Sequence, residues 1–369
     1  MRTGGAFSDR TTVEALVRRV AERARRLERQ VTFMEVCGTH THAIAACGLR
    51  RLLPPRIRLL SGPGCPVCVT PVDYLDRAEA LAALPDVIVC TFGDLLRVPS
   101  SRGSLERARA RGCDVRVVYS PRDALSIARD HPSMRVVFLA VGFETTVPTV
   151  AAVLAEAESE RIANLRILPG GKRIEPPLRA LVADGEVHID GFLLPGHVSV
   201  IIGADAYAFL GEELAVPAAI VGFAPADILL GVAELVQQVL DRRPRVANLY
   251  ASVVRPAGNR HAQELIARFL EPVATRWRGL GVIPDSGLGL RAAWAHRDAS
   301  RIEVAVPEPR EPQGCRCGEV LKGVVEPPAC PLFARTCTPD TPLGACMVSS
   351  EGTCAAWYRH DRAGAGTAA

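Results

Sequence analysis

Four cysteines near the C-terminus carry the strongest chemical signal in the sequence. Cys315, Cys330, Cys337 and Cys354 follow the spacing C-x14-C-x6-C-x16-C. Thiolates are soft ligands that suit iron–sulfur clusters, zinc and low-valent metals. The spacing is wider than a ferredoxin run, and it lacks the C-x2-C pairs of a zinc ribbon. We therefore predict that these four thiols hold a 4Fe–4S cluster, with a structural zinc ion as the alternative.

Two more cysteines, Cys317 and Cys346, lie among these four. Six thiols therefore compete for four ligand positions, and the sequence alone does not settle the choice. If the wide pattern holds the cluster, the two cysteines that remain could form a redox pair beside it.

Cys37 opens a Cys-Gly-Thr-His-Thr-His run directly after a predicted strand. The glycine permits a turn from strand to helix, and a helix N-terminus stabilises the thiolate form that binds metals. His40 and His42 could supply a second ligand, a proton or a hydrogen bond to a bound group. A buried cysteine with two histidines that cap a helix is the alternative, but a second cysteine motif favours a functional role.

Cys65 and Cys68 form that second motif, in the run Gly-Pro-Gly-Cys-Pro-Val-Cys. The C-x2-C spacing, the proline between the thiols and the helix predicted after them are typical of a thioredoxin-type redox site. As a dithiol the pair could give two electrons to a bound partner, and as two thiolates it could bind a metal. Half of a structural zinc site is the alternative, but the N-terminal part of the chain has no second C-x2-C pair.

Between residues 31 and 254, short apolar runs rich in β-branched residues alternate with helical stretches. This alternation indicates parallel α/β sheets that are buried on both faces. The number of predicted strands suggests two α/β units in tandem, at residues 31–134 and 135–254, that face a cleft. The predicted strands are Val31–Val36, Ile57–Leu60, Val87–Thr91, Val115–Tyr119, Arg135–Val141, Leu165–Leu168, Gly191–Leu194, Ala218–Val221 and Leu249–Val254.

Polar, glycine-rich loops follow five of these strands, and they contain both N-terminal cysteine motifs as well as Asp94, Glu144 and His197. Ligands of open α/β sheets bind at the carboxyl ends of the strands. We therefore expect the five loops to converge on one cleft between the two units. The two carboxylates and the histidine are candidates for hydrogen-bonding or proton-transfer groups there, although each could instead cap a helix.

The two ends of the chain differ from this middle part. Residues 12–30 are predicted to form one amphipathic helix, with an apolar stripe that includes Leu16 and Val20. From about residue 255 onward, prolines interrupt helical pieces, and the cysteine-rich tail follows. We expect residues 255–369 to form a third, mostly helical domain that carries the cluster, and residues 1–30 to pack with it.

The composition argues against several classes of function. The formal net charge is only +4, and basic residues of the N-terminal helix alternate with glutamates, so a nucleic-acid role is not expected. We recognise no signal peptide and no membrane-spanning stretch. Twelve cysteines in a chain that we expect in the reducing cytoplasm indicate metal or redox chemistry in place of a disulfide framework. No phosphate-binding loop or dinucleotide fingerprint indicates a nucleotide-driven mechanism.

Taken together, these motifs resemble those of the HypD family of hydrogenase maturation factors. The resemblance runs from about residue 30 to about residue 360, and no family cysteine is missing. The runs that carry it are Met34-Glu-Val-Cys-Gly-Thr-His-Thr-His, Gly62-Pro-Gly-Cys-Pro-Val-Cys, Thr91-Phe-Gly-Asp, Val141-Gly-Phe-Glu-Thr-Thr, Leu194-Pro-Gly-His-Val, Cys315-Arg-Cys-Gly-Glu, Cys330-Pro-Leu-Phe, Cys337-Thr-Pro and Gly344-Ala-Cys-Met-Val-Ser-Ser-Glu-Gly-Thr-Cys.

The resemblance implies a scaffold on which the iron–dicyanide–carbonyl fragment of NiFe hydrogenases is assembled. It implies a complex with a small HypC-like chaperone, and delivery of cyanide by a HypE-like protein that works with HypF. Cys37 would then be a thiolate ligand to the iron, shared with a cysteine of the chaperone. Cys65 and Cys68 would be the redox-active dithiol beside it, and the tail cluster an electron relay similar to that of ferredoxin–thioredoxin reductase. Such a protein is an assembly scaffold with redox activity more than a conventional turnover enzyme.

Two other functions are compatible with the same residues. A stand-alone disulfide reductase driven by the tail cluster would depend on Cys65 and Cys68 but not on Cys37. A zinc-stabilised interaction protein would contain stoichiometric zinc and would lack the visible absorbance of iron–sulfur proteins.

Overall fold

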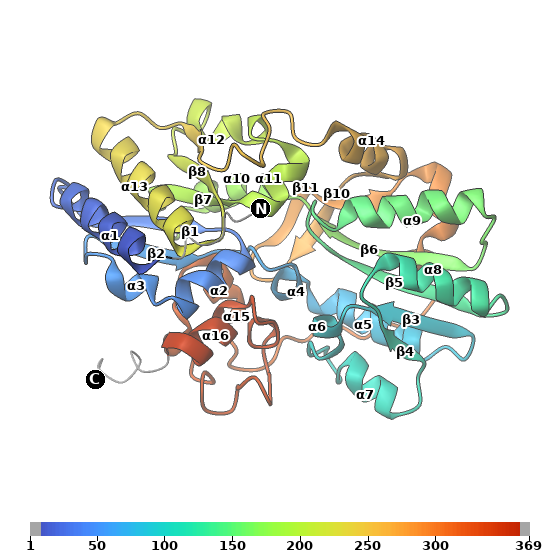
Figure 1. The fold of residues 1–369 in the computed structure, drawn as a ribbon. Coiled ribbons are helices and arrows are strands. Elements are labelled where there is room, and N and C mark those ends of the chain that lie inside the picture. Colours follow the sequence, from blue (N-terminus) through green and yellow to red (C-terminus); the bar gives the residue numbers. More distant parts are fainter. Residues whose placement is uncertain (1–8, 362–369) are drawn as a thin grey trace.

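The computed structural model describes residues 9–361. They form two α/β units, each built around one β-sheet, that lie side by side (Figure 1). The first sheet is entirely parallel, with the strand order β2-β1-β7-β8-β9. Its strands are β1 (Val31–Glu35), β2 (Ile57–Ser61), β7 (Gly191–Pro195), β8 (Ala218–Val221) and β9 (Val246–Asn248).

The second sheet has the order β10-β11-β6-β5-β3-β4. Four of its strands are parallel, and the hairpin β10–β11 adds to β6 in antiparallel fashion. Its strands are β3 (Val87–Thr91), β4 (Val115–Val117), β5 (Arg135–Gly142), β6 (Leu165–Lys172), β10 (Leu270–Trp277) and β11 (Gly281–Leu290).

The predicted α/β fold with two sheets that contain parallel strands is confirmed, but the sheets do not follow each other in tandem. The first sheet combines residues 31–61 with residues 191–248, so a division near residue 135 does not separate the two units. The reason is that each strand is apolar and buried on both faces. Such a pattern shows that a segment is a central strand, but it does not show which strand lies beside it.

Two strand assignments also change in the C-terminal half. The hairpin β10–β11 lies in a stretch where the sequence predicts helical pieces interrupted by Pro272 and Pro284. Pro272 is tolerated because β10 is an edge strand, where one side of the backbone needs no partner, and Pro284 lies where the register of the hairpin shifts. The ninth strand is Val246–Asn248, and the expected strand Leu249–Val254 is a turn.

The N-terminal helix packs on the first sheet layer and not on the cysteine-rich tail, in contrast to the prediction. Helix α1 (Arg10–Ala24) lies along α13 (Pro225–Asp241), as Figure 1 shows. Its apolar stripe joins the core cluster that also contains Ile228, and Arg23 Nη1 donates to the carbonyl oxygen of Ala233 (2.6 Å). The stripe identified the buried face correctly, but it carried no information about the partner.

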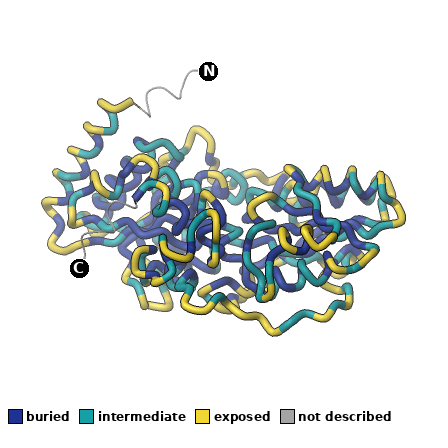
Figure 2. The backbone as a smooth tube through the Cα atoms, turned by 90° about the horizontal axis from the view of Figure 1, so that it is seen from below, coloured by how far each residue is buried: buried dark blue, intermediate teal, exposed yellow. Residues whose placement is uncertain are grey.

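The other helices pack on the two sheets, and buried residues gather in the interior of the molecule while exposed residues lie mostly at its periphery (Figure 2). No helix between residues 9 and 361 is long and apolar enough to span a membrane. The remaining α-helices are α2 (Gly38–Ala46), α3 (Leu49–Leu52), α4 (Pro66–Val69), α5 (Val72–Ala82), α6 (Gly93–Leu96), α7 (Leu105–Ala110), α8 (Pro121–Asp130), α9 (Val147–Ser159), α10 (Glu175–Asp184), α11 (Gly196–Ile202), α12 (Ala208–Glu212) and α14 (Arg260–Phe269).

The cysteine-rich tail folds into short helical turns that lie against α2 and α4 (Figure 1). This helical character was predicted, although the hairpin before it belongs to the second sheet. The turns are η2 (Asp205–Tyr207), η3 (Ala292–Arg297) and η4 (Ala299–Arg301) before the tail, and α15 (Cys317–Lys322), η5 (Pro327–Ala329), η6 (Ala345–Met347), α16 (Thr353–Ala356) and η7 (Trp357–Asp361) within it.

Candidate functional site

Three loops of the first sheet bring candidate residues together. Strand β1 pairs in parallel with β2 on one side and with β7 on the other. The carboxyl ends of these strands therefore lie at one edge of the sheet, where β1 leads to Cys37, β2 to Cys65 and β7 to His197. The convergence that the sequence predicts for the first sheet is thus present, with Cys37 at its centre.

Cys37 is the N-cap residue of α2 and is 8% exposed. The pKa of its thiol rises to about 12, chiefly because burial disfavours the thiolate, while hydrogen bonds from the backbone of His40 and Thr39 oppose the rise. The helix N-terminus is therefore not strong enough to keep Cys37 ionised, which corrects the expectation from the sequence. A metal ion that binds this thiol has to displace its proton.

Glu35 lies beneath Cys37 and was not singled out from the sequence. Its carboxylate is fully buried and accepts the backbone N–H of Cys37 on Oε2 (3.1 Å). Burial raises the pKa of Glu35 to about 7, against hydrogen bonds from Ser61, Thr41 and Cys37. The alternation of apolar residues in β1 would have assigned Glu35 to a buried face, which was the available signal for an unusual carboxylate.

Gly64 brings the two N-terminal cysteine motifs into direct contact. The backbone N–H of Gly38 donates to the carbonyl oxygen of Gly64 (3.1 Å). A Cβ on Gly64 would lie only 2.1 Å from the backbone nitrogen of Cys37. The loop before Cys65 can therefore approach Cys37 only because residue 64 has no side chain.

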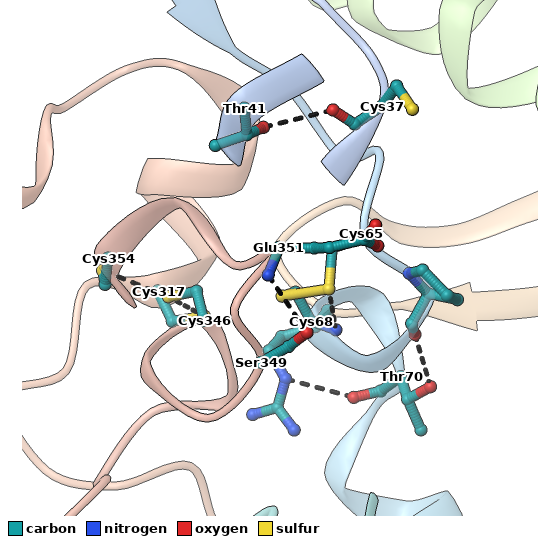
Figure 3. Close-up of a disulfide and its surroundings, with 12 residues drawn as sticks. Cys37, Thr41, Cys65, Cys68, Thr70, Cys317, Cys346, Ser349, Glu351 and Cys354 are labelled. Atoms are coloured by element: carbon teal, nitrogen blue, oxygen red, sulfur yellow. Dashed lines mark hydrogen bonds between the residues drawn. A yellow bond between two sulfur atoms is a disulfide. The ribbon is translucent and has the colours of Figure 1, made fainter. Parts of the chain in front are cut away.

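Cys65 and Cys68 are joined by a disulfide in this structure (Figure 3). Cys65 is 4% exposed and Cys68 is fully buried. Cys65 is the N-cap residue of the single-turn helix α4, and Pro66 occupies its first position, which is the place where proline fits best. The disulfide is therefore buried, and the loop before it borders Cys37.

His40 and His197 both pack against the ring of Phe223. The ring of His197 stacks on Phe223 with 3.9 Å between centroids, and the ring of His40 lies 4.9 Å from it. His40 Nε2 contacts the carbonyl oxygen of Gly222 (2.9 Å), so Nε2 carries the proton, and the buried Nδ1 has no hydrogen-bond partner among residues 9–361. Burial lowers the pKa of His40 to about 4, which keeps this histidine neutral and its Nδ1 lone pair free.

His42, the other histidine of the Cys37 motif, faces the tail. Its ring meets that of His360 edge to face at 5.4 Å between centroids. Nδ1 of His42 is buried without a hydrogen-bond partner, as is Nε2 of His360. The second histidine of the motif therefore packs between α2 and the tail.

Glu351 connects the tail to the Cys37 loop, and the sequence motif did not reveal it. Thr39 Oγ1 donates to Glu351 Oε1 (2.7 Å). A Cβ on Gly38 would lie 2.6 Å from Cβ of Glu351, so the tail lies directly against the start of α2. The negative charge of Glu351 adds to the raised pKa of Cys37 and opposes the lowering of the pKa of His197 by burial. The tail therefore forms one wall of the site.

Glu144 and Asp94 come from the second sheet, and their positions differ. Glu144 is buried after β5, where Oε1 accepts the backbone N–H of Ile174 (3.0 Å) and Oε2 has no partner. Burial raises the pKa of the Tyr207 hydroxyl, and the charges of Glu144 and Cys37 add to that rise. Asp94 lies in α6, and within residues 9–361 we find no hydrogen bond or ion pair between its carboxylate and the other candidate residues. Its assignment to the site stays a prediction.

Replacement of Glu144 by glutamine is expected to change how stability depends on pH. Burial raises the pKa of this carboxyl from 4.5 to about 7. The folded protein then binds its proton more tightly than the unfolded chain, so the stabilisation is complete below pH 4.5 and is lost as the pH rises through 7. Glu144→Gln keeps the neutral form, and its unfolding free energy relative to the original chain should rise by about 2 kcal/mol from pH 5 to pH 8. Denaturant unfolding at both pH values measures this difference; a difference that stays constant with pH contradicts the assignment.

The six tail cysteines lie close together, and Cys317 and Cys346, the two that the sequence leaves outside the predicted ligand set, are in contact. Cys346 Sγ lies 2.8 Å from Cys317 Sγ and 3.3 Å from Cys354 Sγ (Figure 3). The first contact places together the two cysteines that are left over from the predicted ligand set. The second contact brings Cys354, a predicted cluster ligand, to the same pair.

The four predicted cluster ligands fit a cluster of sulfide and iron in three respects. Cys330, Cys337 and Cys354 are buried and Cys315 is partly buried. Backbone N–H groups, which tune cluster potentials, point at the sulfurs: Leu343 donates to Cys337 Sγ (3.3 Å), and the backbone of Cys317 bonds to Cys315. A Cβ on Gly344 would lie 2.7 Å from Cys315 Sγ, so this glycine leaves room beside the thiol.

The thiols of the tail do not converge on a single point. Between residues 9 and 361, no three histidine, cysteine or carboxylate side chains form a group that could hold one metal ion. A 4Fe–4S cluster is a larger body, and its ligand thiolates surround it. The burial of Cys315 and the charge of Cys317 beside it raise the pKa of Cys315 to about 12, so cluster binding has to displace protons here as well.

Comparison with known proteins gives one consistent result. The family model HypD, described as "Hydrogenase formation hypA family", matches residues 11–361. The chain is 46% identical over 354 residues to "Hydrogenase maturation factor HypD" of Escherichia coli (strain K12), which covers 94% of this chain and 95% of that protein. Proteins with the same name from Rhizobium leguminosarum bv. viciae and Rhodobacter capsulatus are 45% and 42% identical, over 90% and 98% of this chain and 89% and 98% of theirs. These matches include both sheets and the cysteine-rich tail.

Proposed function

The chain belongs to the HypD family of hydrogenase maturation factors, and on that premise we propose that it is the scaffold on which an iron fragment with cyanide and carbon monoxide ligands is assembled for a NiFe hydrogenase. The observation that carries this proposal is the contact between a single buried thiol, Cys37, and the loop of a buried disulfide, Cys65–Cys68. Cyanide and carbon monoxide remain on iron that is low-valent and bound to soft ligands. A thiol beside a two-electron store supplies both requirements in a place that is shielded from water.

Each group around Cys37 has a distinct part in this proposal. Cys37 gives its thiolate to the iron cargo after loss of its proton, and Glu35 fixes the backbone N–H beside it. His40 presents a neutral, unpaired Nδ1 that can accept a proton or bind a ligand. His197 is the exposed histidine of the set, and it lies where an incoming partner can reach it.

The tail supplies electrons in this proposal. Cys315, Cys330, Cys337 and Cys354 would hold a 4Fe–4S cluster, which when bound supplies single electrons at low potential. The Cys317/Cys346 pair lies 2.8 Å apart, sulfur to sulfur, and α4 packs against η6, which contains Cys346. This placement supports a thiol relay from the tail to Cys65–Cys68, with the two leftover cysteines as its middle step.

The proposed protein partners supply the iron ligands that this chain does not provide. One thiolate of this chain does not complete the coordination of iron, so we propose that a HypC-like chaperone shares the metal through its own cysteine. Cyanide would come from a HypE-like protein that works with HypF. We place the assembly in the cytoplasm, where the free thiols of this chain stay reduced.

A complementation experiment tests the proposed function. A bacterium that lacks its own HypD-family protein, but keeps the other maturation factors, is supplied with this chain and assayed for NiFe hydrogenase activity. We expect activity to return. Accumulation of the folded chain without any return of activity, in a strain that its own protein rescues, would refute the proposal.

The burial of the Cys65–Cys68 disulfide argues against a stand-alone disulfide reductase. Cys65 is 4% exposed and Cys68 is fully buried, so a protein disulfide has no access to them in this conformation. A reductase would also tolerate the loss of Cys37, whereas the scaffold would not. Metal analysis of anaerobically purified protein separates the zinc alternative, since it predicts zinc in place of iron and sulfide.

A further inference from the structure

Arg278 is a buried cation outside every cysteine motif. It follows β10 in the turn to β11, and its side chain is 2% exposed. Its Nε–H donates to the carbonyl oxygen of Thr70 (3.1 Å), and its backbone N–H donates to the carbonyl oxygen of Val69 (3.0 Å). Val69 is the last residue of α4 and Thr70 its C-cap, directly after Cys68. Arg278 therefore anchors the turn that holds the disulfide.

The same turn lies against the tail. A Cβ on Gly279 would lie only 2.5 Å from Cα of Gly318, at the start of α15. The turn that carries Arg278 therefore contacts the helix that begins at Cys317.

The hydrogen bonds of Arg278 leave one donor group unused. Nη1 pairs with Glu311, whose side chain is about half exposed, but Nη2 is buried and has no hydrogen-bond partner within residues 9–361. A buried donor without a partner costs about 1–3 kcal/mol. Its hydrogen bonds to Val69 and Thr70, and the contact of the next residue, Gly279, with Gly318, place this buried cation between the disulfide turn and the tail.

We propose that Arg278 is a positioning residue for electron transfer, which holds the Cys65–Cys68 turn in register with the Cys317/Cys346 pair. The inference rests on the thiol relay of the proposed function. In the step itself, a thiolate of the Cys317/Cys346 pair attacks the Cys65–Cys68 disulfide and a mixed disulfide forms. The second tail thiol then closes the Cys317–Cys346 disulfide and releases Cys65 and Cys68 as a dithiol, so that two electrons and two protons change sides.

The test follows the internal reduction of the disulfide over time. Full-length protein, purified without oxygen, is reduced with dithionite and quenched with an alkylating reagent, and the labelled fraction of Cys65 and Cys68 is measured by mass spectrometry. Exchange requires close alignment of three sulfurs, so Arg278→Gln should slow this reduction at least about tenfold. Arg278→Lys, which keeps the charge and one donor, should fold more readily and show a smaller loss. Arg276→Gln is the matched control, because the Arg276 side chain is 58% exposed and forms an ion pair with Asp73; the rate of internal reduction should not change in this variant.

A second reductant distinguishes a loss of alignment between the sulfur atoms from a general loosening of the turn that holds the disulfide. Tris(2-carboxyethyl)phosphine attacks the disulfide directly, and a loosened turn would make that attack faster, so Arg278→Gln should not slow it. Internal reduction at the original rate in a folded Arg278 variant overturns the inference, and so does an equal slowing with both reductants. Cys317→Ser distinguishes failure of the relay from failure of this inference. If Cys317→Ser leaves internal reduction intact, the relay of the proposed function is wrong. If Cys317→Ser slows internal reduction but the Arg278 variants do not, this inference alone is wrong.

Discussion

Replacement of Cys37 by serine is expected to abolish iron loading and hydrogenase maturation while the fold persists. Cys37 is the N-cap residue of α2 at the carboxyl end of β1, and its backbone lies directly against Gly64 in the loop of the Cys65–Cys68 disulfide. The loss of residues that merely support metal ligands costs about 10- to 100-fold in affinity or activity. Loss of the ligand itself should therefore cost at least about 100-fold. Complementation of a maturation-deficient strain, with iron analysis of the purified protein, measures both effects.

Cys47→Ser is the matched control for this change. Cys47 caps the other end of α2 and is an exposed free cysteine. Its loss removes the same atom from the same helix and should leave maturation unchanged. If hydrogenase maturation with Cys37→Ser is as high as with Cys47→Ser, Cys37 is not the iron ligand.

Gly64→Ala is expected to disrupt the site as strongly, although it removes no functional group. The added Cβ would lie 2.1 Å from the backbone nitrogen of Cys37 and 2.5 Å from its Cα. Both partners are backbone atoms, so the clash cannot be relieved by a side-chain rotation. We expect a loss of at least about 3 kcal/mol in unfolding free energy, or a displaced loop that no longer supports iron loading. Denaturant unfolding and the complementation assay distinguish these two forms of the loss.

Gly93→Ala tests whether the effect belongs to the close approach and not to glycine as such. Gly93 also follows a strand end in a recognisable motif, but a Cβ there would meet only Val117 Cγ1 at 3.8 Å, which is an ordinary contact. Its stability and maturation activity should stay near those of the original chain. If Gly64→Ala proves as mild as Gly93→Ala, the two cysteine loops do not lie as close as the structure places them.

The sequence predicts the elements of this fold better than their arrangement. Short apolar runs located eight of the nine expected strands, because buried strands must be apolar on both faces. The same uniformity hides the pairing: β1 joins β7, which lies more than a hundred residues further along the chain. The hairpin β10–β11 was missed because Pro272 and Pro284 argue against a strand, and the edge position of β10 and the register shift around Pro284 become evident only once the sheet is known.

In the candidate site, too, the sequence indicates individual residues better than the contacts between them. Cysteine and histidine motifs identified Cys37, His40 and the Cys65/Cys68 pair, because few other arrangements explain such residues at such spacing. Glu351 and Arg278 were out of reach, since their importance arises from contacts between the tail, the second sheet and the Cys37 region that no local pattern encodes. The ionisation of Cys37 was also beyond local reasoning, because burial outweighs the helix terminus.

Infrared spectroscopy of the anaerobically purified complex between this chain and a HypC-like chaperone tests the central claim most directly. Iron-bound cyanide and carbon monoxide absorb where proteins do not. The account predicts these bands in the complex and their loss in Cys37→Ser, with Cys47→Ser unchanged. A complex that supports maturation but contains no iron, or bands that persist undiminished in Cys37→Ser, would contradict it.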